Sequence, residues 1–415
     1  MKIPINKLFV AALLFSLTQT SVASHQQPLS VDNNHRIITS LHDILHEYAR
    51  KKITSKDKDG GFLTAISLTA QCNTHAPVSF VAGSNGISDR TPINENSLFQ
   101  IGSVTKSFVS IVVLQIAKEN KISIDDETII EKWFPEYPKW KHITLRQLMD
   151  MTSGIPGNEN NLPDDIFKKF TAKEYFNKIE PTKILDLTYT LPLHFKPGAK
   201  FEYSNTNYVL LGQFIKKLTH HEPEDEVTMR IINRLGLHNT YFAIDRGNEI
   251  LGVNKSQLVH GYAFYPKSSR PYSFIPYGAD TLPFSLSYTN TAGAMVSTPE
   301  DINRYLHAIF DKHGIFYSYK RQLATFVSKQ TGQHMLAPTI KNNQGFGLGI
   351  IGFYWNKQHP LIYLYNGTTD GFNFAWFVDP ETQTYLVFTI NSRADLLSLD
   401  DALNLFSKAI ETCEI

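Results

Sequence analysis

Residues 99–117 have the sequence Phe99-Gln100-Ile101-Gly102-Ser103-Val104-Thr105-Lys106-Ser107-Phe108-Val109-Ser110-Ile111-Val112-Val113-Leu114-Gln115-Ile116-Ala117. Small and polar residues in the first half precede a run of apolar residues at helical spacing in the second half. The pattern predicts a largely buried helix that the chain enters through Ser103. Lys106 follows three residues later and would lie one helical turn above this serine.

The pair formed by Ser103 and Lys106 allows two interpretations. A serine at a helix N-terminus has its hydroxyl beside unpaired backbone N–H groups and the positive end of the helix dipole. A lysine in a dry, apolar position loses part of its preference for the charged form, and the neutral amine can take a proton from a neighbouring hydroxyl. Ser103 is therefore either an acyl-forming nucleophile or an ordinary N-cap. The same spacing recurs at Ser55 and Lys58, but within the charged segment 54–61, where nothing desolvates the amine.

The first 23 residues have the composition of a secretory signal. Lys2 and Lys7 precede a short apolar core, and small residues stand before the expected cleavage point after Ala23. We therefore expect an exported protein, periplasmic or secreted, with a flexible linker over 24–35. No cysteine follows the cleavage point directly, and no later apolar run is long enough to span a bilayer. Neither a lipid anchor nor a membrane span is expected.

The charge balance is close to neutral. Removal of the signal takes two lysines from the 40 basic residues and leaves 38 against 39 acidic residues. This balance gives no indication of nucleic acid or of an anionic membrane as a partner.

The two cysteines, Cys72 and Cys413, cannot form a zinc site alone. They would either pair in an oxidising compartment, joining an early strand to the last helix, or remain as two buried thiols. His42 and His46 have the spacing of metal ligands, but Asp43 replaces the glutamate of an H-E-x-x-H motif and no third ligand is apparent. A solvated helix face is the favoured interpretation, and no metal site is predicted.

The remaining chain alternates between strand and helix patterns. Helices are predicted at 36–52, 144–154, 208–218, 293–310 and 398–412. Strands are predicted at 62–72, 77–83, 346–354, 361–365, 373–378 and 384–390. Residues 255–290 are rich in Tyr, Pro and Ser without periodicity, which predicts a long ordered loop of the kind that often lines a binding site.

Strands at both chain ends with helices between them predict the α+β class. We expect an α/β sandwich in which one antiparallel sheet, built from both chain ends, is flanked by helices. The mature chain of about 390 residues exceeds one ordinary core. We therefore divide a single domain, 36–415, into a sheet subdomain, 36–120 with 290–415, and an inserted, mainly helical subdomain, 121–289.

Short segments spread over the chain carry a family resemblance. They are residues 98–106, 145–148 with 152–156, 201–205, 296–301 and 366–372. In sequence and order they resemble the motifs of the serine β-lactamase and penicillin-binding-protein superfamily. The resemblance is to the branch with class C β-lactamases, D-Ala-D-Ala carboxypeptidases and related esterases, and it implies the β-lactamase/DD-peptidase-like fold.

The resemblance implies roles for individual residues. Ser103 would attack the substrate carbonyl, and Lys106 would accept or relay its proton. Tyr203, in the Y-x-N motif, would pass the proton to the leaving group. Asn205 would donate its side-chain amide to a substrate carbonyl, or would simply hold its loop. The backbone N–H groups of Ser103 and Thr368 would form the oxyanion hole.

The third motif departs from the family pattern. Where relatives have Lys-Thr-Gly or His-Thr-Gly, this chain has Tyr365, Asn366 and Gly367, which together with Thr368 are the expected substrate-binding residues. The missing cation normally helps to hold a substrate carboxylate, and a charge-assisted hydrogen bond is about twice as strong as a neutral one. Arg393 could supply the charge, or it could be a solvated loop residue. The departure favours a substrate without a free carboxylate.

The resulting hypothesis is an exported serine hydrolase that cleaves an amide or ester through an acyl-enzyme. Its nominal activity is D-Ala-D-Ala carboxypeptidase-like or β-lactamase-related. The alternatives are an esterase or D-amino-acid peptidase for a substrate without a free carboxylate, and a penicillin-binding-like protein without turnover. The expected partner is a small peptide or ester, with a peptidoglycan stem peptide as one candidate. No cofactor is implied, because this chemistry needs only water as the second substrate.

Overall fold

The computed structural model describes residues 31–157, 176, 178–243, 257–265, 275–328, 334–335 and 344–414. The predicted signal segment lies outside these residues, as does most of the predicted linker. No helix within the described ranges combines the length and the apolar character needed to cross a membrane.

The centre of the molecule is an antiparallel sheet of nine strands in the order β2-β1-β14-β13-β12-β11-β10-β8-β9. Its strands come from both ends of the chain: β1 (Ala65–Cys72), β2 (Val78–Gly83), β8 (Phe326–Ser328), β9 (His334–Met335), β10 (Gln344–Phe346), β11 (Ile351–Phe353), β12 (Ile362–Thr368), β13 (Asn373–Asp379) and β14 (Thr384–Ile390). The predicted α+β class, with one antiparallel sheet formed by both termini, is confirmed.

Helices cover both faces of this sheet. On one face, α1 (Val31–Ile53) and α13 (Leu399–Cys413) pack together, and Tyr48 of α1 contacts Phe388 of β14. On the other face, α11 (Pro299–Phe310) places His307 against Tyr385 of β14. Phe388 and Tyr385 are an odd number of residues apart, so their side chains point to opposite faces.

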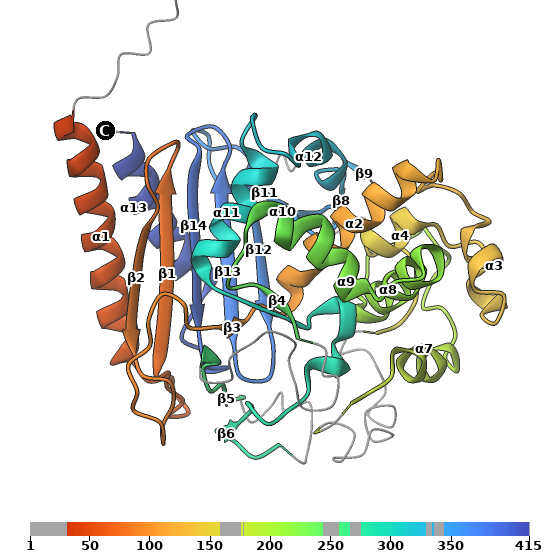
Figure 1. Cartoon of the computed structure of the whole chain (residues 1–415), viewed down its shortest axis with the longest axis horizontal. Helices are drawn as coiled ribbons and strands as arrows, with labels where there is room; N and C mark the ends of the chain where they lie inside the picture. Colours follow the sequence, from red (N-terminus) through yellow and green to blue (C-terminus); the bar gives the residue numbers. More distant parts are fainter. Residues whose placement is uncertain are drawn as a thin grey trace, which may run out of the picture.

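A mainly helical region lies beside the sheet, on the side opposite α1 (Figure 1). Its helices are α3 (Ile129–Trp133), α4 (Leu145–Met149), α7 (Pro181–Tyr189), α8 (Asn205–Thr219), α9 (Pro223–Val227) and α10 (Asn233–Leu235), with a π-helical turn at Thr228–Ile232 and a 3₁₀ turn at Pro138–Trp140. The helix α2 (Thr105–Glu119) is buried along most of its length and contacts α8, α9 and α12 (Tyr317–Leu323).

Short strands and turns complete the fold. β3 (Phe99–Gln100), β7 (Met295–Ser297) and β4 (Tyr241–Phe242) form a small sheet, and β5 (Tyr262–Ala263) pairs with β6 (Ala279–Asp280). Besides the turn at Pro138–Trp140, the described residues contain the 3₁₀ turns η1 (Gly102–Val104), η5 (Leu286–Tyr288) and η6 (Asn290–Ala292).

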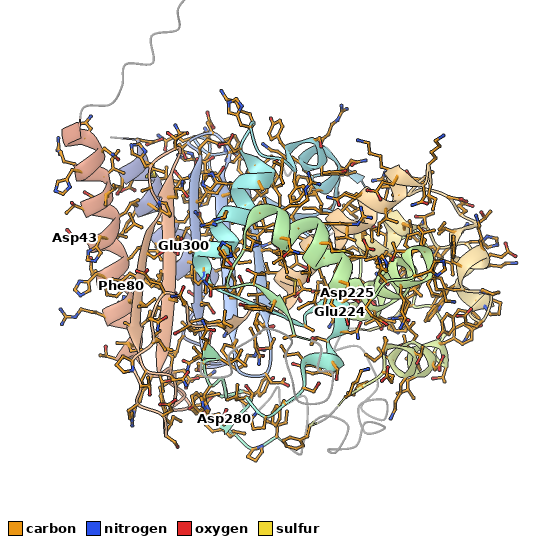
Figure 2. The ribbon with its side chains drawn as sticks, viewed as in Figure 1. Asp43, Phe80, Glu224, Asp225, Asp280 and Glu300 are labelled. Atoms are coloured by element: carbon orange, nitrogen blue, oxygen red, sulfur yellow. A yellow bond between two sulfur atoms is a disulfide. The ribbon has the colours of Figure 1, made fainter. Side chains whose placement is uncertain are left out.

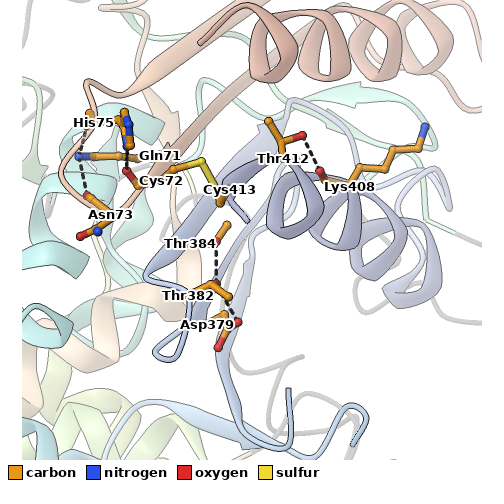
Figure 3. Close-up of a disulfide and its surroundings, with 10 residues drawn as sticks. All are labelled: Gln71, Cys72, Asn73, His75, Asp379, Thr382, Thr384, Lys408, Thr412 and Cys413. Carbon is orange, nitrogen blue, oxygen red and sulfur yellow. Dashed lines mark hydrogen bonds between the residues drawn. A yellow bond between two sulfur atoms is a disulfide. The ribbon is translucent and has the colours of Figure 1, made fainter. Parts of the chain in front are cut away.

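Cys72 and Cys413 form a disulfide, which decides between the two alternatives left open by the sequence. Figure 3 shows that it joins the end of β1 to the last residue of α13. The two cysteines are 341 positions apart, so the bond fastens the C-terminal helix to a strand from the other end of the chain. A cross-link that closes so long a loop strongly restricts the unfolded chain.

Several predicted boundaries differ from the observed ones. Ser103 is not an N-cap: it lies in the turn η1, and α2 begins at Thr105 without a side-chain cap. The predicted helix at 144–154 ends at Met149, although Thr144 caps its start as expected. Met151 has a φ of 66°, a left-handed conformation that a helix cannot continue through.

Three other segments also differ from the prediction. The helix expected at 36–52 begins at Val31, inside the segment predicted as linker. The segment 293–310 contains strand β7 before α11 begins at Pro299, with Thr298 as its N-cap. The segment 346–354 is not one strand, because a turn separates β10 from β11 and folds them into a hairpin.

Candidate active site

The position of Ser103 is fixed by close contact between the turn η1 and strand β12. A Cβ atom on Gly102, whose φ is 50°, would lie 2.7 Å from both the backbone N and O of Thr368. A Cβ atom on Gly367 would lie 1.9 Å from the carbonyl oxygen of Ile101 and 2.8 Å from the backbone N of Ser103. Only glycine fits at these two positions, so the backbone amides of Ser103 and Thr368 lie at one contact point.

The hydroxyl of Ser103 is contacted by two side chains that could move its proton. The Nζ atom of Lys106 donates to Ser103 Oγ at 2.9 Å, and the hydroxyl of Tyr203 donates to the same atom at 2.7 Å. Lys106 comes from the first turn of α2, whereas Tyr203 comes from the segment just before α8. The structure therefore brings together the three residues predicted as catalytic, although they span a hundred positions of the sequence.

Lys106 is completely buried, and its amine is held in place by neutral groups. In addition to Ser103 Oγ, Nζ donates to Asn205 Oδ1 at 2.9 Å and to the carbonyl oxygen of Ala292 at 2.7 Å. It also lies 4.9 Å from the centre of the Tyr203 ring and 5.5 Å from that of Tyr208. These contacts aim the amine at the serine rather than at solvent.

Asn205 lies where either of its two expected roles is possible. It is the first residue of α8, its backbone N–H donates to the carbonyl of Gly157 at 3.0 Å, and its side-chain oxygen accepts from Lys106. The side chain also lines the cavity beside Ser103, where its amide group can reach a bound molecule. Asn205 therefore positions the lysine and borders the space available to a substrate.

Tyr365 occupies the position where the family resemblance implies a cation. Its side chain is 2% exposed, and its hydroxyl lies 3.5 Å from that of Tyr203. Burial, reinforced by the neighbouring phenols of Tyr203 and Tyr208, raises the pKa of Tyr365 well above 10. This phenol is therefore neutral at physiological pH and offers a hydrogen bond but no charge.

A cavity of about 400 Å³ opens at Ser103. Its polar lining includes Asn366 and Thr368, two of the predicted substrate-binding residues, whereas Gly367 supports the site through the close backbone contact. The remaining wall beside the phenols is apolar and aromatic. It is formed by Phe201, Phe346 and Ile351, and the ring of Phe346 meets those of Phe201, Tyr203 and Tyr365.

Arg393 also lines this cavity, but not at the position of the missing cation. Its Nη1 atom lies 3.3 Å from Asn373 Oδ1, and Asn373 pairs with Thr368 across β13 and β12. Tyr365 lies three residues earlier on β12, which is roughly 10 Å along a strand. Arg393 is therefore neither a freely solvated loop residue nor a replacement for a cation at residue 365.

Sequence reasoning missed several parts of this site. The carbonyl of Ala292 has no side-chain signature, so nothing in the sequence could identify it as a partner of Lys106. The apolar wall depends on the β10–β11 hairpin, in which β11 pairs with β12. The sequence pattern predicted a single strand in place of this hairpin. The predicted loop at 255–290 gave a partial indication, since it supplies Tyr265, whose ring lies against Arg393.

The sequence motifs that were set aside lie elsewhere. Ser55 donates to the carbonyl of Lys51 at 2.7 Å, and Lys58 is exposed. His42 and His46 stack on each other and meet the edge of Phe80. Phe80 belongs to the outermost strand β2 (Figure 2). Within the described ranges, no group of three or more His, Cys, Asp or Glu side chains is arranged to hold a metal ion.

Comparison with known proteins identifies the family. The β-lactamase family model matches residues 72–406. The chain is 24% identical over 359 residues to the protein flp of Staphylococcus aureus (strain N315), an alignment that covers 83% of this chain and 63% of flp. It is 25% identical over 279 residues to penicillin-binding protein 4* of Bacillus subtilis (strain 168), covering 63% and 54% of the two chains. This chain thus spans less than two thirds of the length of either relative.

Solved structures show the same fold. A D-amino acid amidase from Ochrobactrum anthropi SV3, complexed with L-phenylalanine amide, superposes with a TM-score of 0.68 at 22% identity, covering 91% of this chain and 98% of the amidase. A class C β-lactamase superposes with a TM-score of 0.64 at 16% identity, covering 92% and 98%. The chain belongs to the β-lactamase family. The roles of the individual site residues stay predictions.

Proposed function

We propose that this protein is a serine hydrolase that cleaves an amide or ester through an acyl-enzyme on Ser103. The observation that carries the proposal is the position of Ser103 Oγ at the cavity wall, within hydrogen-bond distance of both Lys106 Nζ and the Tyr203 hydroxyl. A nucleophile, a base and a proton carrier in mutual contact are what acyl transfer requires. A structural N-cap would need neither partner.

The geometry supports a two-stage reaction. In the first stage Ser103 attacks the substrate carbonyl while Lys106, with its amine neutral, takes the hydroxyl proton. The carbonyl oxygen becomes negatively charged and is stabilised by the backbone N–H groups of Ser103 and Thr368. Tyr203 delivers its proton to the leaving group as the carbon–nitrogen or carbon–oxygen bond breaks, and the serine proton taken up by Lys106 then restores the Tyr203 hydroxyl. In the second stage a water molecule attacks the acyl-enzyme. Its OH group joins the acyl group, which leaves as the carboxylic acid, and its other proton passes to Ser103 Oγ.

The leaving group is proposed to be neutral. It must depart on the side of Tyr203, where the closest neighbours are the uncharged phenol of Tyr365 and the ring of Phe346. A carboxylate placed there would lose its hydration without gaining an ionic partner, which is unfavourable. This favours an amide, ester or D-amino-acid peptide without a free carboxylate on the leaving group. The fold similarity to a D-amino acid amidase agrees with it.

A D-Ala-D-Ala carboxypeptidase-like activity is the second candidate. It is favoured by the similarity to penicillin-binding protein 4*, and it would make a peptidoglycan stem peptide the substrate. We also propose that the protein is exported, to the periplasm or beyond the cell. The Cys72–Cys413 disulfide supports this location, because such bonds persist mainly in oxidising compartments.

A substrate panel tests the proposal. It compares D-alanine p-nitroanilide, a D-Ala-D-Ala peptide, nitrocefin and p-nitrophenyl esters, each with the wild type and with Ser103→Ala. We expect turnover of the anilide or of the esters that is lost in Ser103→Ala. Preferential cleavage of the D-Ala-D-Ala peptide would support the second candidate. No turnover of any compound, together with no labelling by a fluorophosphonate, would indicate a binding protein without catalysis.

A further inference from the structure

The two ends of the cavity differ in charge. The leaving-group end is formed by Tyr203, Tyr365 and Phe346, none of which carries a charge when the phenols are protonated. The other end lies past Thr368, where Arg393 enters the cavity lining. If Ser103 attacks a carbonyl whose leaving group faces Tyr203, the acyl half of the substrate extends toward Thr368 and Arg393. This orientation rests on the proposed function.

Arg393 is held in place by three contacts and also lines the cavity. Its backbone N–H donates to the carbonyl of Tyr262 at 3.0 Å, and its guanidinium lies 5.2 Å from the centre of the Tyr265 ring. Its Nη1 atom has only a long contact, 3.3 Å, to the neutral amide oxygen of Asn373. The hydroxyl of Tyr265 donates to Asp370, so this ring is itself fixed in position.

The guanidinium lacks the partner that such a group usually has. Arg393 forms no ion pair with any described residue, and its Nε atom is buried without a hydrogen-bond acceptor. The side chain is only partly buried, but its Nε–H group is shielded from water without an acceptor, which is unfavourable until a ligand oxygen reaches it. Its planar donor fork matches the two oxygens of a carboxylate.

We infer that the acyl half of the substrate carries a carboxylate, which Arg393 binds at the end of the cavity beside Thr368 and Asn373. The substrate class is then an amide or ester of an acidic acyl group, such as a D-amino acid with an acidic side chain, with a neutral leaving group. Arg393 is a specificity-determining residue in this assignment and takes no part in bond breaking. The charge lies at the opposite end of the substrate from the one that a cation at residue 365 would hold.

Matched substrates test this inference. The p-nitroanilides of N-acetyl-D-glutamate and N-acetyl-D-glutamine differ only in the charge at the side-chain end, and the aspartate and asparagine pair provides a shorter reach. We expect the acidic member of at least one pair to have a kcat/KM about tenfold or more above its amide. In Arg393→Met this ratio falls to about one, and in Arg393→Lys part of it is kept. Arg50→Met, which removes an exposed arginine on α1, keeps the wild-type ratio.

Each outcome separates the inference from the function on which it rests. Turnover with a ratio of one or less in both wild-type pairs, or a high ratio that persists in Arg393→Met, would overturn the inference and leave the hydrolase intact. Calorimetric titration of both pairs into Ser103→Ala provides a readout that needs no turnover. Tighter binding of the acidic members, lost in a Ser103→Ala, Arg393→Met double variant, supports the subsite even if the wild type hydrolyses nothing. Equal binding of acid and amide contradicts it.

Discussion

Replacement of Lys106 by methionine separates the chemistry of this amine from its structural role. Methionine keeps the length and apolar stem of the side chain but removes the group that contacts Ser103 Oγ. Lysine here is completely buried, so the substitution leaves neither a large cavity nor a new contact with solvent. The expected consequence is a folded protein whose serine is no longer activated.

The size of each effect follows from the contacts. Loss of a positioned base typically slows acyl transfer by about 10²- to 10⁴-fold, which corresponds to roughly 3–5 kcal/mol in the barrier. The buried Ala292 carbonyl also loses its donor, at about 1–3 kcal/mol, and the partly buried Asn205 Oδ1 loses its donor at a smaller cost because it borders the cavity. Removal of a fully buried amine relieves a desolvation cost of several kcal/mol, which opposes that loss. We therefore expect a small change in stability beside a large change in rate.

The assay is the second-order rate of labelling by a fluorescent fluorophosphonate, with the thermal unfolding midpoint measured on the same samples. Lys52→Met is the matched control, since Lys52 is also buried and donates to the Leu396 carbonyl at 2.6 Å and to Asp401 at 2.7 Å. Lys52 fastens α1 to α13, so this variant should lose stability but keep its labelling rate. Labelling of folded Lys106→Met within tenfold of the wild-type rate would refute the assignment of Lys106 as the base.

Three further predictions concern single residues. Tyr203→Phe should lower kcat by about 10²-fold or more with a smaller change in KM, in steady-state assays with a p-nitroanilide. Gly367→Ala should reduce kcat at least as strongly, because the new Cβ would lie 1.9 Å from the Ile101 carbonyl oxygen. This clash would force β12 away from the oxyanion hole. Circular dichroism checks that the variant is folded. Burial lowers the pKa of His307 from 6.5 to about 4. As the pH falls, the unfolded chain therefore takes up this proton before the folded protein does. The free energy of unfolding, and with it the urea midpoint, should decrease between pH 6.5 and pH 4.

Each of these predictions has a contrary outcome. Wild-type kcat in Tyr203→Phe would show that another group protonates the leaving group. Normal turnover by Gly367→Ala would show that the oxyanion is stabilised elsewhere. The His307→Phe variant keeps a ring against Tyr385 and should lose part of the pH dependence between 6.5 and 4. An unchanged slope would assign the pH dependence to other groups.

The architecture could be predicted from the sequence because it follows from local patterns. Alternating and continuous apolar runs located the strands β1, β2, β13 and β14 to within a few residues, and the helix predicted at 398–412 is observed as α13. The expected start of the helix at Ser103, and with it the alternative of an ordinary N-cap, was wrong. The positive φ of Gly102 and its close packing against β12 place the serine in a 3₁₀ turn, and that contact is not local in sequence.

The site itself was only partly accessible from the sequence. The three-residue spacing of Ser103 and Lys106 indicates that their side chains lie one helical turn apart. Tyr203 could be added to this pair only through the family resemblance. The register of β12 against β13 decides that Arg393 lies beside Thr368 rather than beside Tyr365, and no local pattern specifies this register. Whether Cys72 and Cys413 lie close enough to pair was likewise open until the ends of β1 and α13 were placed together.

The most direct test of the central claim is to trap the acyl-enzyme. Wild-type protein and Ser103→Ala are incubated with the best substrate of the panel or with a fluorophosphonate, quenched in acid, and analysed by intact mass spectrometry followed by peptide mapping. We predict one adduct per chain on the wild type, located at Ser103 in the peptide that also contains Lys106, and none on Ser103→Ala. An adduct at another residue, or equal labelling of both proteins, would contradict the account.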